Sequence, residues 1–440
     1  MIQQTIFPFK LAVTKEALTA RSGLSLFAEY NHGIGLRELA DKYLPAPGSN
    51  RGFKPSVFVN SMVLMLQGGG RSFEDLRELK NDDGLMKLIG YDNIPDPDTA
   101  GDWTRRMGSI IKGQSGLNGL GDVRDVLNHR IIKRDSAKEY TLDADATGIV
   151  AEKEEAMYTY KGDKGYMPML GFLYELGLCL YDEFREGNTS PAFGQNVFYK
   201  ECKGRMPKGK RIGYYRADSA SYQSELINEL EMDKVIWTIT ADLDKAVKAL
   251  IMEIPEGQWK EPEKGCDYEI AETVHSMNNT RKAFRLVIKR ELRKQENLFE
   301  SSETYFHHAV ATNWAEEARS AVEVLKWHNQ RGQAENFNKE LKDGFGMERM
   351  PCGQTEANAV FFRMGVIAYN LFIGFKRLSC PESWAKHTIA TFRWKMIQVA
   401  GRIVKHAGIV TLKIASGMEK LELFLGIRQR IYELNLASDA

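Results

Sequence analysis

Cysteine is scarce in this sequence, and its few copies are not arranged for disulfides or for metal binding. The 440 residues include 5 cysteines, and no two of them form a C-x-x-C pair. An odd number of scattered thiols argues against a disulfide framework and against a zinc ribbon. We therefore predict a protein of a reducing compartment, the cytoplasm. The thiols are Cys179, Cys202, Cys266, Cys352 and Cys380.

An excess of charge of one sign is also missing. Lys and Arg number 60, Asp and Glu 59, and the formal net charge is +1. This balance excludes a histone-like protein that holds nucleic acid by bulk positive charge. The composition, 43% hydrophobic and 27% charged, is that of a globular protein. The length predicts more than one domain, because a single core rarely exceeds about 250–300 residues.

Long apolar runs are nearly absent. The first residues, MIQQTIFPFKLAV, lack a basic region followed by a sustained apolar stretch, so we expect no signal peptide. One apolar run, residues 357–375, approaches the length of a membrane span but contains Arg363 and Asn370. We predict a buried helix of a soluble core there, and no membrane partner.

What the sequence does contain is a change of pattern near residue 139. Before it, short apolar-periodic segments separated by glycine and proline predict a helical region. From there to about residue 238, alternating or continuous apolar segments predict strands. Residues 240–315 are strand-rich, and residues 315–344 are strongly helical. This order predicts an α/β protein of several domains, of the α+β kind.

Carboxylates occur on or next to the predicted strands. In TLDADAT, alternation places Asp143 and Asp145 on one face, opposite small and apolar residues. Two carboxylates there are costly unless they are solvated, paired or bound to metal. Asp218 follows where another strand ends and a helix begins, a usual place for site residues in an α/β layer. The alternative for Asp218 is a helix cap.

One face of the predicted helix over 315–344 combines opposite charges. His328, Arg331, Glu335 and Lys342 are 3, 4 and 7 residues apart, which places them within about 60° of arc on an α-helix. A solvated surface with i,i+4 pairs is the commoner origin of such spacing. The aspartates on the strands upstream favour a site instead.

These residues resemble motifs of bacterial insertion-sequence DDE transposases. The R-x3-E-x6-K pattern of residues 331–342 is similar to the family's Y-x2-R-x3-E-x6-K signature, with His328 at the position of the tyrosine. Asp145 in D-x-T resembles the first acid of the family, and Asp218 in RADS resembles the second. The similarity extends over most of the chain, including YKGDKGYMPML at 160–170.

The resemblance implies an RNase H-like catalytic core, interrupted by a β-rich insertion and preceded by a helical N-terminal domain. It implies that Asp145, Asp218 and Glu335 hold two Mg2+ ions, for which Mn2+ would substitute, in an in-line phosphoryl transfer. Asp143 stays open as an alternative ligand from the first strand. The gaps, 218 − 145 = 73 and 335 − 218 = 117 residues, leave room for the insertion between the second and third acids.

The implied function is that of a cut-and-paste transposase. Such a protein binds the terminal inverted repeats of an insertion sequence, cleaves the element's ends and joins the 3′ ends to target DNA. It would act as a homodimer in a synaptic complex, in the bacterial cytoplasm and on the nucleoid when bound to DNA. The implied domains are a helical DNA-binding and dimerisation domain (1–135), the first part of the core (136–238), the β-rich insertion (239–318), the second part of the core (319–378) and a basic C-terminal region (379–440).

Basic clusters predict where DNA would bind. The segments 203–211 and 281–294 hold five and seven cations, and the alternative for each is a solubilising surface. Trp314 is chosen because related transposases stack an aromatic of the insertion on a flipped base, with core packing as its alternative. The residues expected on DNA are Arg105, Arg106, Lys203, Arg205, Lys208, Lys210, Arg211, Arg281, Lys282, Lys289, Arg290, Trp314, His328, Arg331 and Lys342.

Two other functions agree with parts of the sequence. A catalytically silent, transposase-derived DNA-binding or regulatory protein would keep the fold, but the complete set of three acids argues against it. A hydrolase of glycans or small esters that uses two carboxylates would explain the acids, but not the cations on the same helix face as Glu335.

Overall fold

The computed structural model describes residues 11–49, 51–111, 113–297 and 300–436. Helices make up most of the chain before residue 135, as predicted: α1 (Leu24–Gly33), α2 (Leu36–Tyr43), α3 (Pro55–Gly68), α4 (Leu76–Lys80), α5 (Asp83–Ile89), α6 (Pro97–Gly108) and α7 (Gly116–Ile132). α3 starts with Pro55, whose missing N–H is not needed in a first turn, and stops at Gly69, which has a φ of 110°. α6 begins at Pro97, because proline suits the first helical position.

A mixed sheet forms the centre of the molecule. Its core strands are β4 (Glu139–Ala146), β8 (Met169–Leu173), β9 (Leu178–Glu183), β10 (Arg211–Ala217) and β11 (Ile236–Thr240). They lie in the order β9-β8-β4-β10-β11. β4, β10 and β11 are parallel to one another, whereas β8 and β9 are antiparallel additions at the other side of β4. This is the strand order of an RNase H-like core, so the predicted fold class is confirmed.

Helices and a small sheet surround these strands. α8 (Gln195–Gly204) and α9 (Ser224–Met232) precede and follow β10, and the short strands β5 (Ile149–Val150), β6 (Met157–Tyr158) and β7 (Lys164–Tyr166) form a sheet of their own after β4. A further two-residue pair, β2 (Ile110–Ile111) and β3 (Gln114–Ser115), precedes α7.

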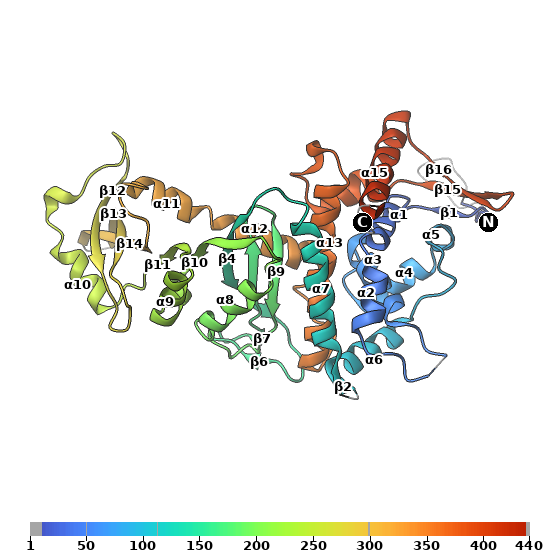
Figure 1. Cartoon of the computed structure of the whole chain (residues 1–440), viewed down its shortest axis with the longest axis horizontal. Helices are drawn as coiled ribbons and strands as arrows, with labels where there is room; N and C mark the ends of the chain where they lie inside the picture. Colours follow the sequence, from blue (N-terminus) through green and yellow to red (C-terminus); the bar gives the residue numbers. More distant parts are fainter. Residues whose placement is uncertain (1–10, 50, 112, 298–299, 437–440) are drawn as a thin grey trace.

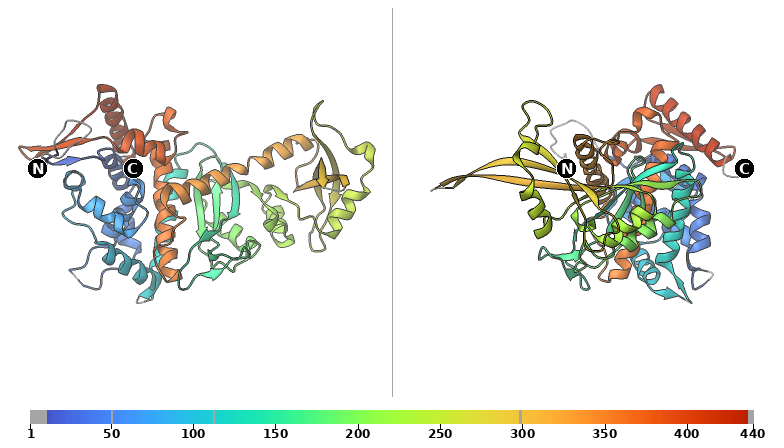
Figure 2. Two further views of the ribbon diagram at one scale, coloured as in Figure 1. Left: turned by 180° about the vertical axis from the view of Figure 1, so that it is seen from behind. Right: turned by 60° about the vertical axis from the view of Figure 1, so that its left-hand side comes forward.

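The strand-rich segment after β11 extends the same sheet. It contains α10 (Lys245–Glu253), β12 (Tyr268–His275), β13 (Phe284–Asn297) and β14 (Glu300–Thr312). β14 pairs antiparallel with β11, which makes the sheet eight-stranded. This segment forms one end of an elongated molecule (Figure 1), and the long β13–β14 hairpin projects away from it (Figure 2). Ladder hydrogen bonds therefore join the insertion directly to the core.

The chain then returns to the core through α11 (Ala321–Asn329), α12 (Gly332–Lys339) and a π-helical turn over Glu340–Gly344. α13 (Thr355–Leu378) follows and packs against α3, α6 and α7 on one side and β9 on the other. Among the described residues, α13 is the one helix with the length and composition to cross a membrane, and its most apolar stretch is entirely buried inside the protein. The prediction of a buried core helix for residues 357–375 is confirmed.

The last part of the chain packs on the first helices. It consists of α14 (Ile389–Phe392), β15 (Gly401–His406), β16 (Ile409–Ile414) and α15 (Met418–Leu436). β15 pairs with β1 (Leu18–Thr19), and α15 contacts α1. Both ends of the described chain thus lie at the end of the molecule opposite the insertion (Figure 1). The five-part domain division stays a prediction.

Candidate active site

Two of the predicted acids lie at the same edge of the sheet. β4 and β10 are parallel neighbours, and Ala144 and Ala217 form the last pair of their ladder. Asp145 and Asp218 are the next residues on the two strands. Because the carboxyl ends of parallel strands meet at one edge, the two carboxylates are neighbours in space.

Glu335, the third predicted acid, influences Asp145 through its negative charge. Burial raises the pKa of Asp145 from 3.8 to about 7, the negative charge of Asp218 adds to this rise, Arg331 opposes it and Glu335 adds to it again. An Asp145 oxygen accepts a hydrogen bond from the Asn338 amide of α12 at 3.0 Å. The structure therefore brings the strand ends and α12 together around one partly buried carboxylate.

Asp218 is both a cap and a member of this group. Its Oδ1 accepts a hydrogen bond from the backbone N–H of Ala220 at 3.0 Å and starts a short 3-10 turn, Ser219–Ser221. The two interpretations of Asp218 are thus compatible. Glu335, in the first turn of α12, is exposed, and its side chain forms no hydrogen bond or ion pair with another described residue.

The helix that carries Glu335 is not continuous, and here the prediction is wrong. α11 ends at Asn329, Gln330 and Arg331 form the break, and α12 begins at Gly332. The Arg216 guanidinium donates to the backbone carbonyl of Trp327 at 2.9 Å, in the last turn of α11. Beyond α12 the π-helical turn changes the helical phase again, so the single helical face over residues 328–342 does not exist.

Lys342 nevertheless lies beside the first strand. Its Nζ donates to the carbonyl of Gly148, three residues past Asp145, at 2.7 Å. Arg331 is partly exposed, and its charge reaches Asp145. The proposal of phosphate contacts for both cations stays a prediction.

His328 is buried, which corrects its expected place on DNA. Its exposed fraction is 3%. Nδ1 is 2.8 Å from the Thr238 hydroxyl and Nε2 is 3.0 Å from the Thr240 hydroxyl, both on β11. Burial, and the charges of Arg331, His308 and Arg216, lower the pKa of His328 to about 3. A neutral ring held by two hydroxyls fixes α11 to the sheet and does not present a proton to phosphate.

Asp143 is also buried and has a different partner. Both of its carboxylate oxygens accept hydrogen bonds from Arg216, at 2.8 and 2.9 Å. The interpretation of Asp143 as an alternative metal ligand is therefore not supported, because its carboxylate is completely buried and paired with Arg216.

The donor chemistry fits a hard divalent cation. Asp218 and Glu335 place negative charge near Asp145, and the Asn338 amide oxygen is buried without a donor from the described chain. Oxygen donors of this kind are the ligands of Mg2+. The side chains do not yet converge: across the described ranges, no three His, Cys, Asp or Glu residues are close enough to hold a metal ion.

The cations of residues 203–211 mostly have partners. Lys203 pairs with Asp233, and Arg211 pairs with Glu139, but their side chains remain 48% and 54% exposed. Lys210 donates to backbone carbonyls at residues 135 and 137, and Arg205 pairs with acids at 125 and 201. Lys208 is exposed. Their contact with DNA stays a prediction.

Two residues of the insertion are buried, contrary to prediction. Arg290 is 5% exposed, because Glu256 and Glu269 bind its guanidinium and the Trp259 ring covers it at 4.2 Å. Trp314 is 8% exposed and packs edge-on against Trp327, with ring centroids 4.7 Å apart. Neither is free to meet DNA in this structure. Each has a core role instead.

The other expected contacts lie on the surface or beside local partners. Lys282 is exposed and pairs with Glu231. Arg281 contacts the Met232 sulfur. Arg105 pairs with Asp102 one turn earlier in α6. The remaining N-terminal cation, Arg106, donates to a backbone carbonyl at residue 46, at 2.6 Å.

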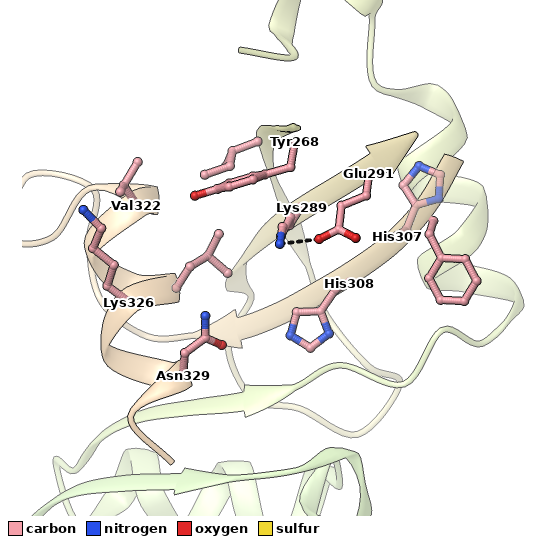
Figure 3. A pocket seen from close by; sticks show the side chains of 11 residues that line it. Tyr268, Lys289, Glu291, His307, His308, Val322, Lys326 and Asn329 are labelled. Atoms are coloured by element: carbon pink, nitrogen blue, oxygen red, sulfur yellow. Dashed lines mark ion pairs between the residues drawn. The ribbon is translucent and has the colours of Figure 1, made fainter. Parts of the chain in front are cut away.

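A cavity that the sequence did not indicate lies between the insertion and α11. It has a volume of about 350 Å³. Tyr268, Lys289 and His308 line it from the sheet, and Lys326 and Asn329 face it from α11 (Figure 3). Lys289 pairs with Glu291 and lines the cavity, and its contact with DNA stays a prediction.

Two positioning groups of the site were also missed, Arg216 and Asn338. The signal for Arg216 was local: it stands two residues before Asp218 on a predicted strand, where alternation gives both the same face. Asn338 had a signal too, three residues after Glu335 on a helix.

The fold and the acids define an RNase H-like domain with a carboxylate site at the ends of its parallel strands. A family model described as transposase DDE domain group 1 matches residues 8–436. The chain belongs to this family, which confirms the resemblance to DDE transposases. Membership implies a metal-dependent nuclease and strand transferase, and the family generally uses divalent metal ions.

A solved structure with a similar chain is the cryo-EM structure of the piggyBac transposase synaptic complex with hairpin DNA. The TM-score is 0.44 and the identity 12%, over 96% of this chain and 83% of that chain. Comparison with curated proteins gives no match.

Proposed function

We propose that this protein is an active DNA transposase of an insertion sequence, which binds the element's terminal inverted repeats, cleaves its ends and joins the 3′ ends to target DNA. The observation that supports the proposal is that Asp145 and Asp218 follow the last paired residues of two parallel neighbouring strands, and that the charge of Glu335 acts on Asp145. Burial, and then the negative charges of Asp218 and Glu335, raise the pKa of Asp145, as expected where a bound cation is needed to neutralise the group. Family membership supports the same chemistry.

The three acids would hold two divalent cations, Mg2+ or Mn2+. When bound, such ions supply activation of a water or 3′-hydroxyl and stabilisation of the leaving oxygen. The chain's own part is to orient the acids. Asn338 holds one oxygen of Asp145, and the backbone of Ala220 holds one oxygen of Asp218. Arg331 and Lys342 flank the group and would bind phosphates of the DNA backbone.

Double-stranded DNA is the proposed partner, bound through local patches because net charge is near zero. Lys203, Lys208, Arg211 and Lys282 keep exposed side chains that suit phosphate contacts. A homodimer is proposed because two element ends have to be brought to two sites. The proposed location is the bacterial cytoplasm, and the nucleoid when DNA is bound.

The test uses the inverted repeats that flank the gene. Duplexes that carry these ends are incubated with the full chain and Mg2+, and nicked and joined products are resolved on a gel. Glu335→Gln should lower the cleavage rate at least a hundredfold, because even loss of a ligand's outer partner costs about 10–100-fold. Asp343→Asn, an exposed acid eight residues further on, is the matched control and should cleave normally. Full cleavage by Glu335→Gln would refute the proposal.

A second candidate is a catalytically silent DNA-binding or regulatory protein derived from a transposase. The observation in its favour is that the three carboxylates do not converge on a metal position in the described residues. Such a protein would bind the repeats in a mobility-shift assay, yet cleave neither strand at any Mg2+ or Mn2+ concentration. Chelator-sensitive cleavage by the wild-type chain would exclude it.

A further inference from the structure

One buried arginine links the two strands that lead to Asp145 and Asp218 with the end of α11, just before the helix of Glu335. Arg216 lies on β10 and is completely buried. Its Nε and Nη2 donate to the two oxygens of Asp143 on β4, at 2.8 and 2.9 Å. Arg216 and Asp143 are also direct partners in the parallel ladder between these strands. The pair therefore joins β4 to β10 through side chains as well as through the backbone.

The remaining nitrogen of the same guanidinium reaches the helices. Nη1 donates to the Trp327 carbonyl at 2.9 Å and to the Gln330 side-chain oxygen at 3.4 Å. The Trp327 carbonyl also accepts from the backbone N–H of Gln330 at 3.2 Å, so the arginine is a second donor to a carbonyl in the last turn of the helix. The arginine thus stabilises the end of α11 at the break that precedes the helix of Glu335.

Aromatic rings hold the guanidinium in place. Its central carbon is 4.2 Å from the centre of the Tyr174 ring and 4.7 Å from that of Trp327. Rings packed against a planar fork leave its N–H groups free to donate in defined directions. A lysine at this position would keep the charge but lose the fork, so it could not serve Asp143 and the helix end at the same time.

The spacing along the strands turns this contact into a constraint on the site. Asp143 stands two residues before Asp145, and Arg216 two residues before Asp218, so each pair shares one face of its strand. We infer that Arg216 is a positioning residue that sets the separation of Asp145, Asp218 and Glu335, so that the three acids can hold divalent cations together. The inference rests on the proposed function, because it assigns those acids to metal binding.

A purely stabilising role is the competing explanation, since buried ion pairs occur without any function. Arg124 provides a matched control. It is also buried, with 1% of its side chain exposed, and it donates to Asp182 and Asp125. That arginine joins α7 to β9 and not to the strand ends that carry Asp145 and Asp218.

The experiment compares Arg216→Lys with Arg124→Lys in the full chain, without DNA. Mn2+ binding is measured by titration calorimetry or by the loss of the free-ion electron spin resonance signal, and folding by thermal unfolding. We expect Arg216→Lys to bind Mn2+ at least tenfold more weakly than the wild type, in the range for lost outer-shell support. Arg124→Lys should remain within twofold. Wild-type affinity in Arg216→Lys, or equal weakening in both variants, would overturn the inference.

Asp143→Asn serves if Arg216→Lys does not fold, because the amide keeps one acceptor for the guanidinium. It should weaken Mn2+ binding several-fold, and wild-type binding in this variant would also overturn the inference. The outcome is separable from the proposed function. A wild-type chain that binds Mn2+ but never cleaves its repeats refutes the function alone. A chain that cleaves its repeats, and whose Arg216→Lys variant binds Mn2+ as the wild type does, refutes the inference alone.

Discussion

Two regions of this molecule hold carboxylates inside the protein, and they treat them in opposite ways. Asp182 on β9 is fully buried and accepts from Arg124 on α7 and from Arg363 on α13. Burial alone would raise its pKa, but the charges of Arg363 and Arg124 lower it below 3.8. Asp145 on β4 has acids as neighbours, and burial together with Asp218 raises its pKa to about 7.

This difference distinguishes Asp182, which holds the fold together, from Asp145, which belongs to the candidate active site. The two arginines neutralise Asp182 within the chain, and the three residues join the N-terminal helices and α13 to the sheet. Asp145 accepts a hydrogen bond from one amide, and the charge of Arg331 offsets its negative charge only in part. Most of that charge therefore remains to be neutralised by a ligand from outside the chain. Asp145 therefore says more about function than Asp182 does, because folding alone does not favour a partly buried acid without a matching cation.

The largest effect on stability is expected when Asp182, the acid paired with two arginines, is replaced. Asp182→Asn leaves the buried Arg363 without a countercharge and Arg124 with Asp125 alone, and such a loss costs about 3–5 kcal/mol of the free energy of unfolding. Urea denaturation at pH 7 measures it, and Mg2+ should leave the difference in stability between the variant and the wild type unchanged. Asp163→Asn, at an exposed position, is the control and should change stability little. An equally small effect at Asp182 would mean that its ion pairs are not essential for the fold.

Metal addition should distinguish the two regions next. Mg2+ at a hundred times its dissociation constant should stabilise the wild type by about 2.7 kcal/mol, because only the folded chain holds the acids together. Thermal unfolding with increasing MgCl2, at constant ionic strength, measures this. The gain should disappear in Asp218→Asn and persist in Asp163→Asn. An undiminished gain in Asp218→Asn would place the metal elsewhere.

A smaller effect follows from the raised pKa of Asp145. The folded pKa of about 7 exceeds the usual 3.8, so folding favours the protonated acid. The ionised acid then lowers the stability of the metal-free chain progressively from about pH 4 to pH 7. Asp145→Asn should therefore stabilise the metal-free protein at pH 8, by about 1–3 kcal/mol after allowance for solvent screening. At pH 4 the variant should match the wild type, and a stability gain independent of pH would contradict the assignment.

The parts that the sequence predicted rest on local information. Alternation over residues 139–146 gave a strand with its acids on one face, and the parallel pairing of β4 with β10 then placed Asp145 beside Asp218. The apolar run of α13 predicted a buried helix despite its two polar residues. Both have partners: Arg363 binds Asp182, and Asn370 accepts from the backbone of Cys179.

The parts that it missed depend on contacts between distant segments. The break before α12 occurs where Arg216 meets the Trp327 carbonyl, 111 residues away in the chain. The helical periodicity of residues 315–344 carries no information about that contact, so the sequence predicts one continuous helix there. The burial of Arg290 and Trp314 could not be predicted for the same reason. In a sequence, a cation or an aromatic residue that binds DNA looks the same as one that packs against another part of the fold.

The smallest predicted effect tests how strongly Arg331, a partly exposed cation, influences the pKa of Asp145. Arg331 lowers the pKa of Asp145, so Arg331→Gln should raise that pKa further and reduce the stability of the metal-free chain at pH 8. The change should stay below about 1 kcal/mol, because Arg331 is partly exposed and water screens it. Urea denaturation of a double-mutant cycle measures it, and the effect should vanish in the Asp145→Asn background.

Lys208→Gln, a change at an exposed lysine, is the control for this cycle and should leave the stability of both backgrounds unchanged. Suppose that Arg331→Gln costs as much in the Asp145→Asn background as it does with the native aspartate. The arginine then acts on the fold and not on the acid, and the charge balance at this edge has to come from the bound metal alone.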